Sequence, residues 1–363
     1  MYSKREVIAA MLEQNSGIEI GLYTLGDIGP DPHTGSTISA GQRLKEIIEA
    51  AKLADESGLD IFGVGEHHRL DYAISTPPVV LAAIAQNTKR IKLTSATTVL
   101  STIDPVRLFE DFATLDLLSD GRAEIIAGRG AFVESFPLFG YSTDDYDALF
   151  SENIELFLKL NENERMSSWN GHFRSPLKDA EIAPRPLQKQ LPIWVGVGGS
   201  PESAARAGRL GVGMAVAILS GDPARFKPLV DLYRQTGIEA GHASENLKVG
   251  VTGHGYIAKT TKQAKDEFYP YYSNYWSYVN LQRGMTSLMS RAEFEQLTEA
   301  DTALFVGSPE QIIEKILRQH ELFGHQRFMA QIDIGGIPFK KIAEGIELLA
   351  TEVAPIVRRE TRK

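Results

Sequence analysis

Residues 59–68 read Leu-Asp-Ile-Phe-Gly-Val-Gly-Glu-His-His, and this stretch indicates the fold class. Its first part, Leu59 to Val64, is a short apolar run that ends at Gly65, which is typical of a strand buried on both faces of a parallel sheet. The preceding segment, Thr37 to Ser57, carries apolar side chains at helical spacing, and Gly58 follows as a stop signal. A helix followed by a buried strand is the repeating unit of parallel α/β proteins.

The same alternation continues along the chain on both sides of this stretch. Strands are expected at 18–24, 59–64, 91–100, 123–127, 193–197, 212–218, 247–257 and 327–334, and helices at 37–57, 77–87, 105–118, 144–160, 200–209, 223–240, 261–281, 309–323 and 338–357. Pro270 should kink or split the helix that contains it. Eight strands joined by helices favour a closed α/β barrel, a (β/α)8 TIM barrel, over an open sheet.

Two segments interrupt this rhythm. Residues 161–191 contain three prolines and predict an excursion outside the barrel, such as a hairpin. Residues 282–304 form a second insertion before the last strand, and we expect them to act as a lid over the site, unless they prove rigid and packed. The chain is therefore predicted to form one barrel domain over residues 1–363 with two insertions.

Composition excludes several classes of protein. The 363 residues include no cysteine, which rules out disulfides, cysteine metal sites and thiol catalysis. The net charge is −9 and no basic run appears, which argues against a nucleic-acid partner. No apolar run approaches the roughly 20 residues of a membrane span, and no signal peptide is evident at the N-terminus. We expect a soluble, cytoplasmic protein.

In such barrels the chemistry lies where strands end, so residues just after strands are the candidates. Glu66, His67 and His68 follow the second strand, and histidine titrates near neutral pH, which suits proton transfer. Neighbouring histidines point in different directions, so one can face the site and the other its wall. The alternative is a structural histidine pair with Glu66 as its hydrogen-bond partner. A metal site is not indicated, because no third ligand residue occurs at a spacing typical of metal sites.

Two further strand ends predict an anion site. Arg129 lies between Gly128 and Gly130. The glycines allow a ligand to approach the backbone closely, and the guanidinium offers two parallel donors to an anion. The alternative, equally compatible with this motif, is that Arg129 pairs with a carboxylate at the barrel rim. The turn at 196–203 leads through glycines to Ser200, an expected helix N-cap followed by Pro201. Such a helix start can bind phosphate or can simply be well capped.

The residues 95–100, which are mostly small near the barrel axis, suggest room for a flat ligand there, although ordinary barrel packing explains them as well. Taken as a set, several motifs resemble bacterial luciferase and its relatives. They are residues 66–68, 87–90 with 96–100, 104–107, 115–122, and 128–130 with Phe139-Gly140. Their order and spacing match over 18–140 and again over 192–211, with a weaker match at 306–316.

This resemblance implies a flavin-dependent (β/α)8 oxidoreductase, usually dimeric, that mostly uses reduced FMN. It implies that His67 is the active-site acid–base or peroxide-stabilising group, with Glu66 and His68 as its neighbours. It further implies that the flavin phosphate is held by four residues and that a non-prolyl cis peptide lies beneath the flavin ring. The phosphate residues are Arg129, Gly199, Ser200 and Ser203, and the peptide joins Ala96 to Thr97.

One departure limits the resemblance. Bacterial luciferase carries a reactive cysteine where this chain has Gly128, and Glu134 and Ser135 also differ, so light emission and substrate identity do not transfer. We hypothesise a homodimeric, two-component monooxygenase that receives reduced FMN from a separate flavin reductase and oxidises a small organic substrate with dioxygen. The alternatives are a deazaflavin- or FMN-dependent dehydrogenase or reductase of the same fold, and a non-catalytic flavin-binding protein.

Overall fold

The computed structural model describes residues 17–282 and 288–362. The N-terminal segment for which no signal peptide is expected, and residues 283–287 of the second insertion, lie outside the described residues. In the described part of the chain, no helix is long and apolar enough to cross a membrane.

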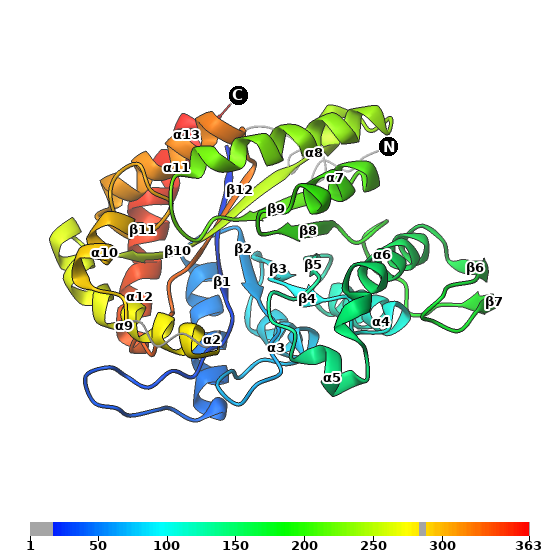
Figure 1. Cartoon of the computed structure of the whole chain (residues 1–363), viewed down its shortest axis with the longest axis horizontal. Helices are drawn as coiled ribbons and strands as arrows, with labels where there is room; N and C mark the ends of the chain where they lie inside the picture. Colours follow the sequence, from blue (N-terminus) through cyan, green and yellow to red (C-terminus); the bar gives the residue numbers. More distant parts are fainter. Residues whose placement is uncertain (1–16, 283–287, 363) are drawn as a thin grey trace.

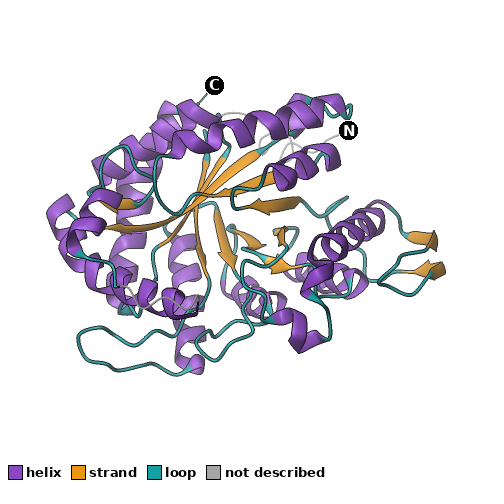
Figure 2. Ribbon diagram, in the orientation of Figure 1, coloured by secondary structure: helices purple, strands orange, loops and turns teal. Residues whose placement is uncertain are grey.

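Within the described residues, eight parallel strands close into a barrel with helices packed around it (Figures 1 and 2). Their bounds are β1 Glu19–Thr24, β2 Ile61–Val64, β3 Lys92–Ser95, β5 Ala123–Gly128, β8 Ile193–Val197, β9 Gly213–Ala217, β10 Val249–Ile257 and β12 Arg327–Gln331. The strand β12 pairs in parallel with β10 on one side and with β1 on the other, which closes the ring. The predicted (β/α)8 barrel is confirmed.

Most helices lie close to their predicted places, but α5 and α10 were not predicted. The helices are α2 Ala40–Glu56, α3 Pro77–Asn87, α4 Pro105–Leu118, α5 Ser135–Phe139, α6 Tyr146–Glu162, α7 Pro201–Leu210, α8 Lys227–Glu239, α9 Thr261–Gln282, α10 Arg291–Leu297, α11 Pro309–Phe323, α12 Phe339–Leu348 and α13 Ala354–Glu360, with short turns of 3-10 helix at Thr143–Asp145, Pro223–Phe226 and Ser244–Asn246. Asp104 and Ser200 cap α4 and α7 through their side chains, as expected.

Three elements differ from the prediction. The strand expected at 91–100 is interrupted at Ala96 and Thr97, and it resumes as β4 Thr98–Val99. Of the kink or split expected at Pro270, the split is wrong, because the helix α9 continues through this residue. One missing N–H does not end a helix that buries Phe268, Tyr271 and Tyr272. The last helix is divided by a π-helical turn at Leu349–Val353, which precedes the proline at position 355.

The first insertion contains the predicted hairpin. The strands β6 Arg165–Trp169 and β7 Leu177–Glu181 pair with each other in antiparallel fashion and not with the barrel. They project from the body of the molecule beside α6 (Figure 1). Residues just after the hairpin return to the barrel, where Leu191 is buried and its backbone bonds to the Asn161 amide.

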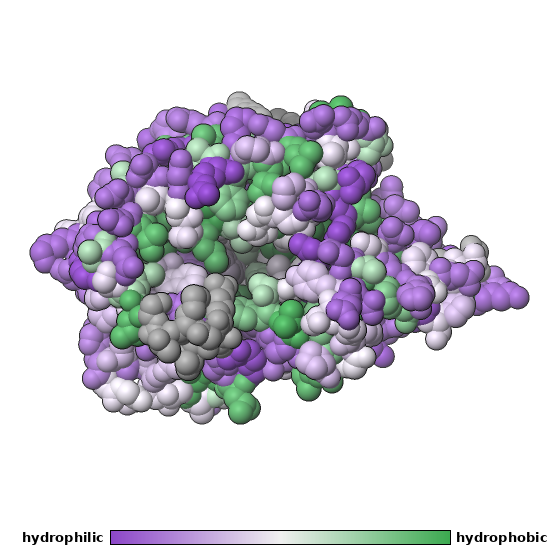
Figure 3. Space-filling model, in the orientation of Figure 1, coloured by the Kyte–Doolittle hydropathy of each residue, from purple (hydrophilic) through white to green (hydrophobic). Residues whose placement is uncertain are grey.

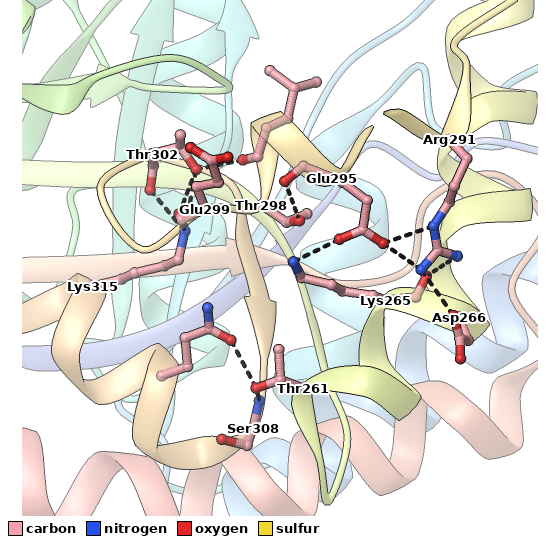
Figure 4. A network of polar contacts seen from close by, with 12 residues as sticks. Thr261, Lys265, Asp266, Arg291, Glu295, Thr298, Glu299, Thr302, Ser308 and Lys315 are labelled. Atoms are coloured by element: carbon pink, nitrogen blue, oxygen red, sulfur yellow. Dashed lines mark hydrogen bonds and ion pairs between the residues drawn. The ribbon is translucent and has the colours of Figure 1, made fainter. Parts of the chain in front are cut away.

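The described part of the second insertion, 288–304, is packed rather than loose. Phe294 of α10 is fully buried, and Glu295 receives hydrogen bonds from Lys265 and Arg291. The buried Lys315 ammonium donates to the carbonyl oxygens of Glu299 and Thr302, which ties the segment to α11 as well as α9 (Figure 4). The expectation of a lid is therefore wrong for 288–304. The short strand β11 Phe305–Gly307 follows and pairs with β10.

Side chains fill the barrel interior in layers. The layers near the strand starts are closely packed, so the site lies at the other end of the strands. At the strand starts, Arg327 of β12 forms ion pairs with Glu124 and Glu19, both at 2.7 Å, and its guanidinium stacks on Trp194. An apolar layer above this network fills the barrel axis; it consists of Tyr23, Ile61, Ile126, Trp194, Ala215 and Met329. The main cavity accordingly lies toward the carboxyl ends of the strands.

Candidate active site

A cavity of about 370 Å³ opens at the carboxyl ends of the barrel strands. The face shown in Figure 3 is hollowed near its centre, among apolar and weakly polar side chains. Strand ends and the loops after them supply most of the lining, and α9 contributes two aromatic side chains. The lining includes Tyr23, Glu66, His67, His68, Ala96, Thr97, Gly128, Arg129, Glu134, Gly196, Gly198, Thr252, His254, Tyr275, Trp276 and Gln331.

His67 is held in place from three sides. Its Nδ1 lies 3.0 Å from Oε1 of Glu134, in the loop after β5. Its ring stacks on Tyr72 at 4.1 Å between centroids and meets the edge of Phe132 at 5.2 Å. Only 8% of the residue is exposed. A buried, oriented imidazole that faces a cavity is suited to proton transfer.

The charge on Glu134 fixes which nitrogen of His67 carries the proton. Partial burial would raise the pKa of Glu134, but hydrogen bonds from His67 and from backbone N–H groups outweigh it and hold this pKa below its ordinary value. An ionised Glu134 can only accept, so Nδ1 of His67 donates to it. In the neutral imidazole Nε2 is then the free base, available to exchange a proton with a ligand.

His68 occupies the wall of the site. Its Nε2 lies 2.8 Å from Oε1 of Glu66, and the other Glu66 oxygen accepts from the backbone N–H of Val99 at 3.0 Å. The His68 ring also meets Phe139 edge-on at 4.9 Å. His68 and Glu66 line both the main cavity and a second, apolar one between α3 and α4. His68 thus borders two cavities, whereas His67 borders the main cavity and not the second one.

Ala96 and Thr97 form part of the cavity wall, and glycines crowd around them. The peptide bond between Ala96 and Thr97 is cis. A Cβ atom at Gly128 would lie only 2.6 Å from Thr97 Oγ1, and one at Gly196 would lie 3.0 Å from Thr97 Cγ2. Both positions need a residue without a side chain, because Thr97 fills the space where one would stand. The luciferase cysteine could not be accommodated at 128 without moving Thr97.

Cationic side chains meet at one rim of the cavity. Nη1 of Arg129 lies 2.5 Å from Oδ1 of Asp147, and Nη2 of Arg206, from α7, lies 3.3 Å from the same oxygen. Burial would raise the pKa of Asp147, but these two arginines hold it below its ordinary value. A second Arg206 nitrogen, Nη1, is buried without a partner. Two guanidinium groups that share one carboxylate form a site able to hold an anion.

Three predicted phosphate residues lie beside the cavity rather than in its lining. Gly199, Ser200 and Ser203 follow the lining residue Gly198 at the start of α7. The Ser200 hydroxyl accepts from the backbone N–H of Ser203 at 3.3 Å, so the serine caps the helix. The other predicted site residues, Glu66, His67, His68, Ala96, Thr97 and Arg129, all line the cavity.

Comparison with known proteins agrees with this geometry. The model of the luciferase-like monooxygenase family matches residues 18–326, most of the chain. The chain belongs to this family. The oxygenase component of a flavin-dependent trigonelline monooxygenase from Acinetobacter baylyi is 24% identical over 333 residues, which cover 86% of this chain and 90% of that protein. The predicted family and the predicted enzyme class, a monooxygenase, are confirmed.

Solved structures share the fold of this luciferase-like chain. The monooxygenase RslO1 from Streptomyces bottropensis has a TM-score of 0.81 at 24% identity and covers 93% of this chain and 99% of its own. The oxygenating constituent of 3,6-diketocamphane monooxygenase from Pseudomonas putida, in complex with FMN, has a TM-score of 0.74 at 23% identity, covering 93% and 98%. An F420-dependent secondary alcohol dehydrogenase has a TM-score of 0.73 at 17% identity, covering 94% and 99%.

The sequence alone did not indicate several residues of this luciferase-like site. Glu134 was noted only as a difference from luciferase, and its contact with His67 spans 67 residues of chain. Asp147 and Arg206 fall inside the helices expected at 144–160 and 200–209, and no sequence pattern singled them out. One local signal was available for Arg206, because it lies one turn after Ser203 and therefore on the same face of α7.

Proposed function

We propose that the protein is the oxygenase component of a two-component, FMN-dependent monooxygenase acting on a small organic substrate. The observation that carries this proposal is the His67–Glu134 pair, which presents an oriented imidazole to a cavity with an anion site on its rim. The named relative from Acinetobacter baylyi, itself an oxygenase component, supports a separate flavin reductase as partner. One barrel domain and a cytoplasmic location belong to the same proposal.

The residues present fit FMN. The phosphate would meet Arg129 and Arg206, with the N-cap of α7 at Ser200 and Ser203 beside them. The isoalloxazine would lie against Ala96 and Thr97, where glycines keep the wall free of larger side chains. An unpartnered, buried nitrogen of Arg206 indicates that this rim can accept more negative charge than Asp147 supplies.

Bound reduced FMN would supply two electrons to dioxygen, of which one atom goes to the substrate and the other to water. His67 would exchange a proton through Nε2, while Glu134 keeps the proton on Nδ1 and holds the ring in place. Tyr72 stacks on the His67 ring and Phe132 contacts it edge-on, and both aromatic rings shield this imidazole from bulk water.

A homodimer is part of the proposal, and an apolar surface supports it. Large apolar side chains are exposed on α3, the end of α4 and α5; they are Val79, Leu117, Leu118, Leu138 and Phe139, each at least 45% exposed. Three of them, Val79, Leu118 and Phe139, line the second cavity, between α3 and α4. A patch of this kind on a water-exposed face indicates a protein partner, and we assign it to a second copy of the chain.

Oligomeric state tests the assignment of this surface. Leu118→Asp should yield monomers in analytical ultracentrifugation, because a carboxylate would be buried without a counter-ion at the interface. Ile238→Asp, at a comparably exposed apolar position on α8, should leave the dimer intact. A monomeric wild-type protein, or equal effects of both substitutions, would contradict the assignment.

Cofactor titration tests the main proposal. Anaerobic protein should bind reduced FMN and not a reduced deazaflavin, measured by flavin fluorescence and calorimetry. Tight binding of the deazaflavin with none of FMN would refute the proposal in favour of a dehydrogenase or reductase. The variant His67→Ala should keep near-normal FMN affinity but lose turnover with dioxygen. Unchanged turnover would reduce His67 to a structural role, and a wild-type protein that binds FMN without any turnover would be a carrier rather than an enzyme.

A further inference from the structure

Three adjacent strands place uncharged polar side chains in one layer of the cavity wall. Gln331, the last residue of β12, pairs in register with His254 of β10. On the other side Leu22 pairs with Ala330, so Tyr23 of β1 stands next to Gln331. Tyr23, His254 and Gln331 all line the main cavity. This wall consists of β1, β10 and β12, and it lies apart from the β5 and β8 ends that lead to Arg129 and Ser200.

The side chain of Gln331 lacks partners within the protein. The residue is 0% exposed, and both its amide oxygen and its amide nitrogen are buried without a hydrogen bond. Buried polar groups are nearly always paired, so an exception in a cavity wall points to a ligand. A ligand group that reaches this amide must supply both a donor and an acceptor, or its binding is weakened.

The two side chains beside Gln331 in this wall, Tyr23 and His254, are uncharged near pH 7. Burial lowers the pKa of His254 to about 3, so its imidazole is neutral near pH 7. Burial, and to a lesser degree the nearby Asp333, raises the pKa of Tyr23, so its phenol keeps its proton. The charged residues of the lining, Glu66, Arg129 and Glu134, follow β2 and β5 instead. An ionised ligand group at Gln331 would therefore be desolvated without a counter-ion.

We propose that Gln331 determines substrate specificity by pairing with an uncharged group that offers a donor and an acceptor side by side, as a carboxamide or lactam does. This proposal rests on the proposed function, because it takes the Arg129 side of the cavity for the flavin and leaves the β1, β10 and β12 wall for the substrate. The planar amide of Gln331 matches such a group with two parallel hydrogen bonds.

Binding of four single-ring probes to the FMN-loaded protein tests the proposal. The probes are benzamide, ethylbenzene, benzoate and benzylamine, which share a ring and differ in the polar group. Benzamide should bind the wild-type protein best in calorimetry, by on the order of tenfold over ethylbenzene. The variant Gln331→Leu should lose most of this preference while its FMN affinity is unchanged. Preferred binding of benzoate or benzylamine would overturn the proposal.

A matched control separates ligand recognition from folding. Gln319 of α11 is 1% exposed and also has both amide atoms unpaired, but it does not line the main cavity. Gln319→Leu should leave the probe preference intact. Gln331→Leu should unfold at the same or a higher temperature than the wild type, since it removes an unpaired amide. A lower unfolding temperature would show that Gln331 has a structural role and would contradict the proposal.

The outcomes distinguish this proposal from the proposed function. A fall in FMN affinity in Gln331→Leu with an unchanged probe preference would assign the amide to the flavin ring, and would overturn the substrate role alone. A wild-type protein that binds no FMN would refute the proposed function. In that case the same probe titration, run on FMN-free protein, still decides whether Gln331 selects an uncharged amide.

Discussion

Substitution of Gly128 by alanine should disturb the wall on which the flavin ring is proposed to lie. The new Cβ would stand 2.6 Å from Thr97 Oγ1 and 3.0 Å from Thr97 Cβ, whereas ordinary contacts begin near 3.4 Å. Rotation of the Thr97 side chain cannot relieve the clash, because its own Cβ does not move. The backbone at Thr97 must therefore shift.

Overpacking of this kind typically costs about 1–3 kcal/mol of unfolding free energy. Urea unfolding followed by circular dichroism measures the cost. Gly198→Ala is the matched control, because Gly198 also lines the cavity but no atom lies within 4 Å of its Cβ position. This control should change the stability by less than about 0.5 kcal/mol.

A double-mutant cycle tests whether the clash with Thr97 causes the loss of stability in Gly128→Ala. Thr97→Ala removes Oγ1 and Cγ2, so Gly128→Ala should cost less in that background, with a coupling energy on the order of 1 kcal/mol. FMN should also bind Gly128→Ala more weakly, by about fivefold or more if the ring lies on Thr97. Additive effects of the two substitutions, or equal losses from Gly128→Ala and Gly198→Ala, would refute the reasoning.

Four further predictions follow from the site and its surroundings. Glu134→Gln should slow oxidation of bound reduced FMN in stopped-flow measurements by about 10–100-fold and alter its pH profile, with unchanged FMN affinity, because it removes the charge that fixes the proton of the imidazole. Arg206→Met should weaken FMN binding by about tenfold but leave riboflavin, which lacks the phosphate, unaffected. Asp147→Asn should instead tighten FMN binding by up to about fivefold, because the Asp147 carboxylate, which competes with the phosphate for the two guanidinium groups, loses its charge. Acidification from pH 7 to pH 5 should lower the unfolding free energy by about 2 kcal/mol for each of His254 and His325. Burial lowers the pKa of both imidazoles to about 3 in the folded protein, so between pH 7 and pH 5 they bind protons only in the unfolded chain.

The fold was predictable because its signals are local. Apolar runs such as Leu59 to Val64, helix caps such as Asp104 and Ser200, and the helical spacing between them depend on neighbours a few residues away. The barrel then follows from the count of strands and the handedness of their connections. His67 was predictable for the same reason, since its place directly after a strand puts it at the active end of a barrel.

The residues that the sequence did not reveal act over long distances in the chain. Glu134 reaches His67 through a loop whose course no local pattern sets, and Arg206 meets Asp147 across 59 residues. Gln331 looks like any strand end, and only its missing partners distinguish it. The lid expectation for 288–304 was wrong because insertion length says nothing about anchoring, which Phe294 and Lys315 provide.

The ion network at the start of the barrel strands has a consequence for the order of binding. Arg327, Glu124 and Glu19, with the apolar layer above them, close one end of the barrel to diffusion. The proposed flavin ring site at Thr97 and the proposed substrate site at Gln331 both line the main cavity at the other end. If both molecules enter from that end, a substrate already seated in the cavity blocks a flavin that, as proposed, arrives from a separate reductase. Excess substrate should therefore slow turnover by trapping the flavin-free protein, and productive cycles should begin with the flavin.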